Sequence, residues 1–458
     1  MQNQLIFDRQ LIQKYDTAGP RYTSYPTALE FNDSFTQADF IKHAALSNKG
    51  GGPLSLYFHL PFCDTVCFYC GCNKIITKNR AHAAPYLASL YKELALKAAC
   101  VDTSRPVTQL HWGGGTPTFI SKQQMQQLMQ QTREHFHITD DADISIEVDP
   151  REASADTIAL LRQLGFNRIS LGIQDFDPFV QKAVNRIQSE AETLAIINAA
   201  RQQQFHSISV DLIYGLPLQT LSSFDTTLDK IIAADPDRIS LFNYAHLPEL
   251  FKSQRQINRE QLPSAEEKLN ILQLSISKLT AAGYRYIGMD HFAKPDDELS
   301  RAQLQNRLHR NFQGYATHAE CDLLGFGISA IGQIGNAYTQ NVKTLHEYDA
   351  LLQQNKLPLM RGVQLTPEDK LRRWIITRLI CDFELDTEQV TMLSGQPFST
   401  QFAEESRALQ AMVKEGLIDI QQHRLRITAQ GRLLVRNICM IFDQYRKNSP
   451  QQAFSKTI

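Results

Sequence analysis

From about residue 54 to residue 282 the sequence repeats one pattern six times: an apolar β-rich run, a polar loop and a stretch with helical periodicity. This alternation is typical of a parallel sheet whose strands are joined by right-handed helical crossovers. Between the first two runs, apolar residues recur at helical spacing after Pro85, which suits a first helical turn. The six predicted strands cover residues 54–58, 107–112, 144–148, 168–173, 208–213 and 238–242.

Each predicted strand runs into a loop that carries Gly, Asp, Glu, Gln or His. An open doubly wound sheet and a barrel are both compatible with the alternation, but in a barrel these loops converge on one mouth, where chemistry takes place. Six such ends favour a barrel, and only six units make it a partial one. We therefore predict an α/β fold, a partial (β/α)6 TIM-like barrel.

Two further regions flank this core. The first contains the segment 19–27, whose two prolines argue against a regular element. The second begins near residue 364 and predicts a mostly helical, winged-helix-like domain. Its predicted elements are a helix after the N-cap Thr366, a helix over 399–415, a hairpin over 417–427 and a helix from 429. The predicted domains are 1–50, an N-terminal extension over the active site; 51–363, the barrel and its extension; and 364–458, the winged-helix-like domain.

The composition argues against several classes of protein. The 458 residues are 43% apolar and 21% charged, which is ordinary for a soluble globular chain, and the net charge is −1. No global charge favours nucleic acid or an anionic membrane, and no apolar run is long enough to span a bilayer. The first residues have neither the basic region nor the apolar core of a signal peptide. We expect a cytoplasmic monomer without nucleic-acid or membrane partners.

Four of the eight cysteines lie within ten residues, directly after the first predicted strand: Cys63, Cys67, Cys70 and Cys72. The spacing C-x3-C-x2-C, followed by x-C, points to a metal or redox role. The other four cysteines lie in apolar surroundings, and we interpret them as small buried residues.

Thiolates at such close spacing hold iron–sulfur clusters. Three of them, Cys63, Cys67 and Cys70, would leave one iron of a [4Fe–4S] cluster open. S-adenosylmethionine (SAM) can bind that iron through its amino and carboxylate groups, and an electron from the cluster then releases a 5′-deoxyadenosyl radical. The alternative is structural zinc. Zinc sites, however, usually draw pairs of ligands from separate loops, and Cys70 and Cys72 are very close for a tetrahedral pair.

Polar residues at the other strand ends extend this hypothesis. The second strand ends in Gly113, Gly114 and Gly115, and a glycine-rich turn lets backbone N–H groups approach a ligand. Other polar groups end or follow the remaining strands: Glu147, Asp149, Gln174, Arg186, Asp211 and residues 243–246. Each alone is more often a helix cap or a solvated residue, so the argument depends on their common placement at one mouth.

Together, the cysteine spacing, the Gly-Gly-Gly-Thr-Pro motif at 113–117 and the carboxylate strand end resemble the radical SAM superfamily. More specific segments resemble the oxygen-independent coproporphyrinogen III oxidases (dehydrogenases) of haem biosynthesis, the HemN type. These segments are the Cys-Gly-Cys-Asn-Lys run at 70–74 and residues 20–27, 286–293 and 309–315. The resemblance extends from about residue 10 to the end of the chain.

The resemblance implies an oxidoreductase that decarboxylates two propionates of coproporphyrinogen III to vinyl groups, giving protoporphyrinogen IX. It implies one [4Fe–4S] cluster, two SAM molecules and an electron donor such as reduced flavodoxin. The SAM on the open iron would contact Tyr57, Gly114, Glu147 and Ile331. The second SAM would contact Tyr69, Gly115, Thr116, Gln174, Arg186, Asp211 and Ala245.

The implied substrate carries four carboxylates, which a near-neutral chain must bind with local cations. Arg21 and Arg310 are candidates, because a guanidinium pairs with a carboxylate through two hydrogen bonds. Surface arginines in loops are an equal alternative. His59 faces the same mouth and is either an orienting group for the cluster or SAM, or a satisfied core histidine.

Two other functions remain as alternatives. A haem-binding chaperone of the same superfamily shares the three-cysteine motif, but its known forms lack Cys72 and the segment 20–26. A zinc-stapled regulator would bind DNA through the C-terminal domain and would need a basic recognition helix. The helix predicted over 399–415 carries three glutamates against Arg407 and Lys414, so its face is not basic.

Overall fold

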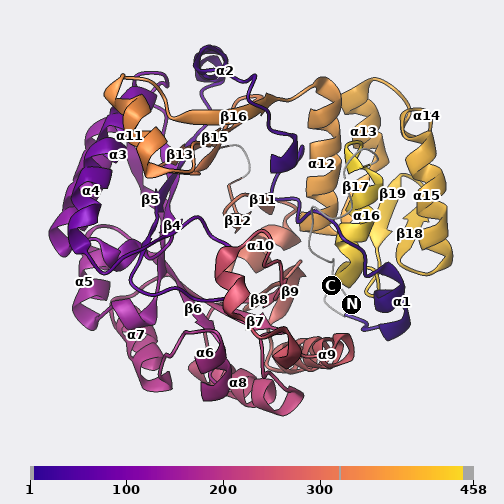
Figure 1. The fold of residues 1–458 in the computed structure, drawn as a ribbon. Coiled ribbons are helices and arrows are strands. Elements are labelled where there is room, and N and C mark those ends of the chain that lie inside the picture. Colours follow the sequence, from indigo (N-terminus) through magenta and orange to yellow (C-terminus); the bar gives the residue numbers. More distant parts are fainter. Residues whose placement is uncertain (1–4, 319–320, 447–458) are drawn as a thin grey trace. The chain divides into compact units, whose positions relative to one another are not determined.

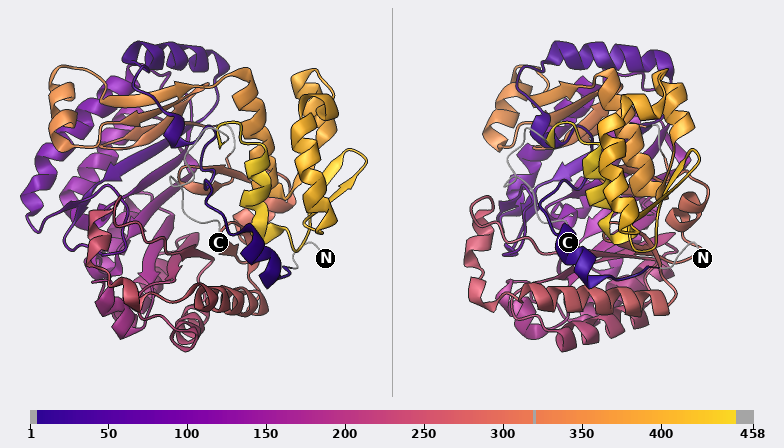
Figure 2. Two further views of the ribbon diagram at one scale, coloured as in Figure 1. Left: turned by 45° about the vertical axis from the view of Figure 1, so that its right-hand side comes forward. Right: turned by 90° about the vertical axis from the view of Figure 1, so that its right-hand side faces the viewer.

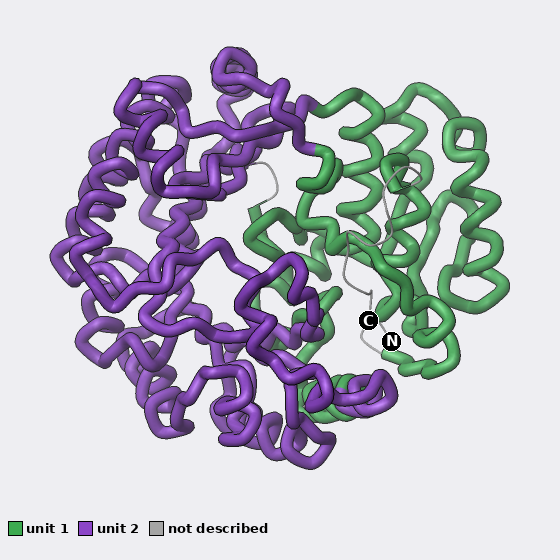
Figure 3. Tube along the Cα trace, viewed as in Figure 1, with its two compact units in different colours: residues 1–30, 272–319, 365–458 green, residues 31–271, 320–364 purple. Residues whose placement is uncertain are grey.

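The structure is a computed structural model, and it describes residues 5–318 and 321–446. The chain forms two compact units, each assembled from separate stretches of sequence (Figure 3). Unit 1 contains residues 1–30, 272–319 and 365–458, and unit 2 contains residues 31–271 and 320–364. This division cuts across the predicted domains, because residues 31–50 group with unit 2 and residues 272–319 with unit 1. The division into three domains stays a prediction.

Unit 2 is built on a parallel sheet that contains all six predicted strands. In spatial order they are β1 (Leu54–Leu60), β4 (Val107–Gly114), β5 (Ile138–Val148), β6 (Arg168–Gln174), β7 (Ser207–Tyr214) and β8 (Arg238–Asn243), and every neighbouring pair is parallel. Apolar side chains hold the register, as where Leu56 lies opposite Leu110 and Ile146 lies opposite Ile169. All four of these side chains are buried.

Helices connect these strands and lie against one face of the sheet (Figures 1 and 2). They are α3 (Ala83–Ala98), α4 (Lys122–His135), α5 (Ala155–Gln163), the short α6 (Pro178–Ala183), α7 (Glu190–Gln202) and α8 (Leu221–Ala234). Several helices begin at a Ser or Thr whose side chain accepts the N3 backbone N–H while the N3 side chain bonds back, as Ser121 and Gln124 do on α4. The apolar face of α3 is fully buried at Leu90 and Leu94.

The sheet of unit 2 continues past β1. Strand β13 (Asp322–Phe326) pairs with β1 in parallel, and β14 (Ile331–Ile334), β15 (Ala337–Asn341) and β16 (Leu359–Gln364) follow in antiparallel order. Because β1 lies between β4 and β13, the six parallel strands form an open arc. This arrangement confirms the prediction of a partial barrel.

Two more helices complete unit 2. Helix α2 (Gln37–Gly50) packs on β14 and β15, and α11 (Leu345–Gln353) packs on α3. Asn32, just before α2, forms a backbone bridge with Gly362 of β16 through two hydrogen bonds of 2.9 Å. These contacts explain why residues 31–50 belong to unit 2.

Unit 1 contains the predicted winged-helix-like domain. Its helices are α12 (Pro367–Asp382), α13 (Thr387–Ser394), α14 (Phe398–Gln401), α15 (Ala403–Lys414) and α16 (Val435–Ile441), and its sheet contains β17 (Glu384–Asp386), β19 (Arg424–Ile427) and β18 (Ile418–Gln421). The sequence predicted one helix over 399–415, but the helix is interrupted at Phe402. The ring of Phe402 is fully buried against Phe398 and Phe442, which accounts for the break.

The remaining parts of unit 1 are short elements. They are α1 (Arg9–Tyr15), α10 (Glu298–Leu304) and two antiparallel strand pairs, β9 (Arg285–Gly288) with β10 (His291–Ala293) and β11 (His309–Asn311) with β12 (Gly314–Ala316). Helix α9 (Ala265–Ala281) carries the chain from unit 2 into unit 1. The segment 19–27 contains no helix or strand, as its prolines predicted. Across residues 5–318 and 321–446, no helix is both long and apolar enough to cross a membrane.

Candidate active site

The carboxyl ends of the six parallel strands share one edge of the sheet, and every predicted SAM-site residue lies in unit 2 at or near this edge. Three lie within strands, namely Tyr57 in β1, Glu147 in β5 and Asp211 in β7. The others are Gly114 and Gln174, which end β4 and β6, Gly115 and Thr116 after β4, Tyr69 in the cysteine loop, Arg186 after α6, Ala245 after β8 and Ile331 at the start of β14.

The cysteine loop leaves β1 at the same edge. Cys63 ends the short strand β2 (Phe62–Cys63), which pairs in parallel with β3 (Ile75–Ile76), and the intervening loop carries Cys67 and Cys70. Two hydrogen bonds fasten this loop to the chain after α6: Phe68 N donates to Val184 O (3.0 Å), and Asn185 Nδ2 donates to Val66 O (2.8 Å). The loop is therefore fastened to the segment directly after α6.

The thiols of this loop fit an iron–sulfur cluster. In a cubane each thiolate binds a different iron, so the ligand sulfurs do not have to converge on one point. A structural zinc ion needs four ligands around one centre, and within the described chain no three His, Cys, Asp or Glu side chains are grouped to hold one ion. A hydrogen bond from the Cys72 thiol and the nearby Lys74 ammonium lower the pKa of Cys70 to about 6. Burial raises the pKa of Cys63 to about 11.

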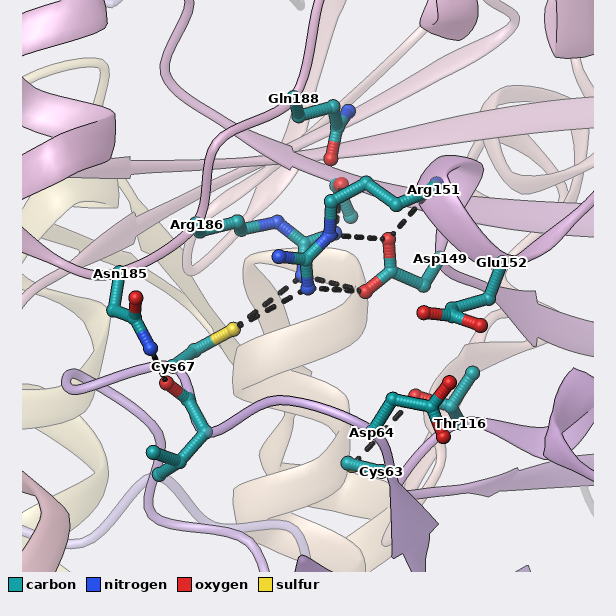
Figure 4. Close-up of polar contacts among 12 residues, drawn as sticks. Cys63, Asp64, Cys67, Thr116, Asp149, Arg151, Glu152, Asn185, Arg186 and Gln188 are labelled. Carbon is teal, nitrogen blue, oxygen red and sulfur yellow. Dashed lines mark hydrogen bonds and ion pairs between the residues drawn. The ribbon is translucent and has the colours of Figure 1, made fainter. Parts of the chain in front are cut away.

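The sulfurs of Cys63 and Cys67, both predicted cluster ligands, also accept hydrogen bonds from neighbouring side chains (Figure 4). Thr116 Oγ1 donates to Cys63 Sγ over 3.6 Å, and Arg186 Nη1 donates to Cys67 Sγ over 3.6 Å. Arg186 Nη1 also donates to Asp149 Oδ2 over 3.0 Å. Burial alone would raise the pKa of Asp149, but the adjacent guanidinium groups lower it. Asp149 is therefore an ionised partner of Arg186 rather than only a turn residue.

Glu147 is held by polar contacts from the neighbouring strand β4. Gly114 N donates to Glu147 Oε2 over 3.0 Å, and His111 Nε2 lies 3.4 Å from Glu147 Oε1. Burial alone would raise the pKa of Glu147, but the contacts with His111 and Gly114 lower it. The site therefore presents a fixed negative charge beside a glycine backbone.

His59 links Tyr57 of β1 to the cysteine loop. Its Nε2 lies 2.9 Å from the Asn73 carbonyl oxygen, which can only accept, so Nε2 carries the hydrogen. Its Nδ1 then accepts from the Tyr57 hydroxyl over 3.1 Å, and burial lowers the pKa of the imidazole. His59 is thus a neutral, buried histidine that orients Tyr57 and the cysteine loop. A Cβ on Gly114 would lie 2.7 Å from the His59 ring, which explains the glycine there.

A second group of polar residues follows β6 and β7. Gln174 has φ 69°, and its Oε1 is buried with no hydrogen-bond partner among the described residues. Arg186 Nε is also buried with no hydrogen-bond partner among the described residues. Burial raises the pKa of Asp211 to about 6. The negative charge of Glu147 also raises this pKa, whereas the positive charge of Arg186 lowers it. One donor and one acceptor here are thus left for a polar ligand.

Two predicted SAM residues remain, Ala245 after β8 and Ile331 at the start of β14. Gln254, in a 3-10 turn, donates its side-chain amide to Tyr69 O (3.0 Å) and to Ala245 O (3.2 Å), so it joins the cysteine loop to the end of β8. Ile331 begins β14, where it pairs with Gln340 of β15. Its place in the site stays a prediction.

The two arginines predicted to bind substrate both belong to unit 1. Arg21 Nη1 lies 3.0 Å from Asp290 Oδ2 in a half-buried ion pair. The Arg310 guanidinium lies 4.8 Å from the Tyr315 ring centre, and its Nε and Nη1 are buried without a partner in the described parts of the chain. Arg310 therefore keeps donors for an anion, whereas Arg21 already has one.

Sequence reasoning missed three residues of this site: His111, Arg151 and Gln254. Two of them had a usable signal, because His111 lies in the second predicted strand and Arg151 follows Asp149 by two residues. Gln254 had none, since it lies in a loop of ordinary polar composition.

Comparisons with known proteins agree with this geometry. Residues 57–231 match the family described as the radical SAM superfamily, and residues 365–434 match the HemN C-terminal domain. Two curated relatives, both called oxygen-independent coproporphyrinogen III oxidase, match end to end. The Pseudomonas aeruginosa protein is 51% identical over 460 residues, covering 100% of both chains. The Escherichia coli protein is 49% identical over 456 residues, covering 99% of both.

A solved structure described as "Coproporphyrinogen III oxidase (HemN) from Escherichia coli is a Radical SAM enzyme" has the same fold. Its TM-score is 0.92 at 48% sequence identity, and the match covers 96% of this chain and 100% of that one. Sequence, fold and cysteine loop lead to one conclusion: the chain belongs to the family of oxygen-independent coproporphyrinogen III oxidases, within the radical SAM superfamily.

Proposed function

We propose that this chain converts two propionates of coproporphyrinogen III to vinyl groups by oxidative decarboxylation, giving protoporphyrinogen IX. The observation that carries the proposal is the loop of Cys63, Cys67 and Cys70 after β1, in a chain about half identical from end to end to relatives named for this substrate. Superfamily membership implies a [4Fe–4S] cluster and SAM, which when bound supply a 5′-deoxyadenosyl radical.

The chemistry at each propionate is the loss of one hydrogen atom, one CO2 and one electron. With the cofactors bound, the hydrogen atom would leave the β-carbon for the adenosyl radical, the carboxylate would leave as CO2, and the remaining electron would pass to an acceptor. No side chain has to transfer a proton in this sequence. The residues of the site therefore act by binding SAM, by orienting the propionate and by excluding water from a radical.

The first SAM is assigned to Tyr57, Gly114, Glu147 and Ile331. The ionised Glu147 supports this assignment, because a fixed carboxylate accepts hydrogen bonds from an ammonium group or ribose hydroxyls. Gly114 lies beside this carboxylate, because its backbone N–H donates to Glu147 Oε2 over 3.0 Å.

A second SAM is assigned to Tyr69, Gly115, Thr116, Gln174, Arg186, Asp211 and Ala245. The unpartnered Gln174 Oε1 and Arg186 Nε support it, since a ligand with both hydroxyl and carboxylate groups would satisfy both atoms. Substrate carboxylates are assigned to Arg310 and Arg21, of which Arg310 has free donors. The electron donor is a reduced flavodoxin or a similar protein, and the enzyme works as a cytoplasmic monomer.

The test is anaerobic reconstitution of the full chain, followed by absorbance and EPR spectra with dithionite, SAM and coproporphyrinogen III. About four irons per chain, a reduced cluster perturbed by SAM, and formation of 5′-deoxyadenosine and protoporphyrinogen are expected. A cluster that binds SAM without decarboxylation, in a chain that binds haem tightly, would favour the haem chaperone. Binding of one zinc and no iron would overturn the proposal.

A matched pair of cysteine variants sharpens this test. Cys67→Ser removes a predicted cluster ligand and is expected to abolish SAM cleavage, whereas Cys100→Ser alters a partly buried cysteine just after α3, whose thiol donates to Leu96 O of that helix. The Cys100→Ser variant is expected to keep its iron and its activity. Equal loss in both variants would show that the assay reports general damage.

A further inference from the structure

Arg151 lies beside a predicted cluster ligand without belonging to any motif in the sequence. It is in the 3-10 turn Pro150–Glu152 after β5, and its Nη2 donates to Cys67 Sγ over 3.7 Å (Figure 4). Asp149 fixes the side chain through two further bonds, from Arg151 Nε to Oδ1 (3.0 Å) and from Nη2 to Oδ2 (2.6 Å). The guanidinium is thus held in one orientation toward the sulfur.

A second guanidinium converges on the same sulfur. Arg186 Nη1 lies 3.6 Å from Cys67 Sγ and 3.0 Å from the Asp149 carboxylate that also binds Arg151. Two cations therefore share one anion, which leaves a net positive charge beside Cys67. The side chains of Arg151, Arg186 and Asp149 are only 18%, 8% and 11% exposed, so solvent screens this charge little.

The sulfur itself is held in place by the backbone of the loop. The Asn185 amide bonds to Val66 O, next to Cys67, and Arg186 Nη2 bonds to Gly172 O at the end of β6. Arg186 and the loop that carries Cys67 are therefore both fixed by the segment after α6. Cys63 differs, because the hydrogen bond at its sulfur comes from the neutral hydroxyl of Thr116.

Positive charge and N–H donors at a ligand sulfur act on the redox equilibrium of an iron–sulfur cluster. Reduction adds one electron and one negative charge to the cluster while the thiolates stay bound, and nearby cations stabilise the more negative state. Hydrogen bonds to ligand sulfurs are among the features that set the potential of such clusters. The charged pair beside Cys67 is placed to act in this way.

We propose that Arg151, fixed by Asp149, raises the reduction potential of the cluster and so favours uptake of the electron that starts each reaction. This role rests on the proposed function, because it requires the cluster that Cys67 would bind. Arg151 is a positioning and tuning residue here, and the electron comes from a low-potential one-electron protein donor. No bond is made or broken in this step.

The test is a reductive titration of the reconstituted full chain without SAM or substrate, followed by EPR of the reduced cluster at matched iron content. Arg151→Gln is expected to lower the equilibrium constant for one-electron reduction about tenfold, which corresponds to about 59 mV. Arg80→Gln is the matched control, because Arg80 pairs with Asp64 of the cysteine loop and with Glu152 but is 47% exposed and donates to no cysteine sulfur in the described chain. Its midpoint potential should equal that of the wild type.

An unchanged midpoint in Arg151→Gln with a full complement of iron would overturn the proposal. If that variant takes up less iron, Arg151→Met decides, because methionine keeps an unbranched apolar stem but carries neither a charge nor an N–H donor. A midpoint below wild type in this variant supports the proposal, and an identical midpoint overturns it. The wild-type chain separates the two hypotheses: if it binds no iron, the proposed function fails as well.

Discussion

Lys97 and Glu93 form an ion pair one helical turn apart on α3, inside unit 2. Lys97 Nζ lies 2.6 Å from Glu93 Oε1, and the two side chains are 3% and 0% exposed. Glu93 also accepts from Gly327 N (2.7 Å), from Tyr348 Oη (2.6 Å) and from Asn341 Nδ2 (2.7 Å). The carboxylate therefore fixes the chain directly after β13.

Lys97→Met is expected to destabilise the protein by about 3–5 kcal/mol, because it leaves the Glu93 charge buried without its cation. The measurement is urea unfolding followed by circular dichroism. Lys122→Met is the matched control, since Lys122 pairs with Asp156 at 3.8 Å on the surface and should lose less than about 1 kcal/mol. An equal loss of unfolding free energy in the two variants would mean that the buried ion pair contributes no more to stability than the exposed one.

Asp211 predicts a pH dependence of stability. Burial raises its pKa to about 6, above the ordinary value of 3.8. Between these two values the folded state binds more protons than the unfolded state, so the contribution of Asp211 to stability falls as pH rises from about 4 to 6. Asp211→Asn removes this loss and is expected to stabilise the cofactor-free chain at pH 7, by at most about 3 kcal/mol.

The measurement is the unfolding midpoint of the cofactor-free chain at several pH values between 4.5 and 7.5. The gap between Asp211→Asn and wild type should open with rising pH. Asp140→Asn, at an exposed position of β5, should follow the wild-type curve. Parallel curves for Asp211→Asn and wild type would show that the folded state does not hold the proton.

Single residues also mark the limit of what the sequence predicts at the site. The cysteines, Gly114, Glu147 and Asp211 end or follow predicted strands, so a periodic pattern locates them. Arg151 is different, because its role depends on the direction of its side chain within a 3-10 turn. Gln254 is different again, because only the path of a long loop brings it to Tyr69 and Ala245.

The turn after β4 is the element that joins the sheet to the cysteine loop. Gly115 N donates to Leu60 O over 2.8 Å, and Thr116 N donates to Phe62 O over 2.7 Å. A Cβ on Gly115 would lie 2.7 Å from backbone atoms of Pro61 and Phe62, closer than real Cβ contacts. The turn and the loop therefore fit together only with a glycine at position 115.

Gly115→Ala is expected to displace the cysteine loop and to lower iron uptake below four irons per chain on reconstitution. Gly50→Ala is the matched control, because a Cβ there meets nothing within 4 Å at the end of α2. This control should take up the wild-type amount of iron and be as stable as wild type or up to about 1 kcal/mol more stable. Full iron uptake by Gly115→Ala would show that the loop can move aside.

Among the elements, the pattern of six apolar runs predicted the six strands β1 and β4–β8, because buried parallel strands are continuous apolar segments. The pattern did not predict β13, which is parallel to β1, or the antiparallel strands β14, β15 and β16 that continue the sheet. Antiparallel edge strands of four to six residues give little periodic signal, and their pairing depends on tertiary contacts. The break of the C-terminal helix at Phe402 likewise depends on the burial of one ring.

At the scale of the whole molecule, the chain passes between the two units more than once, so segments far apart in the sequence pack together. Unit 1 consists of three separate stretches, so residues 272–319 depend on the C-terminal segment for their packing. Arg378 Nη2 of α12 donates to Leu308 O (2.9 Å), Gln303 Nε2 of α10 donates to Cys381 O (2.8 Å), and the Tyr286 ring stacks on Phe383 at 6.3 Å. Sequence periodicity cannot reveal such pairings, because it describes each segment alone.

A chain that ends at residue 364 tests this division. It lacks α12–α16, so residues 272–319 would expose side chains that are now buried, among them Tyr286, Leu299 and Leu308. Limited proteolysis with mass spectrometry is expected to cut the truncated chain within 272–319 much faster than the full chain. Residues 54–214, which carry strands β1 and β4–β7, should keep their protection, because in the described chain these strands pair only within unit 2. If residues 51–363 instead formed a domain of their own, as the sequence predicts, the truncated chain would resist cleavage within 272–319 as well as the full chain does.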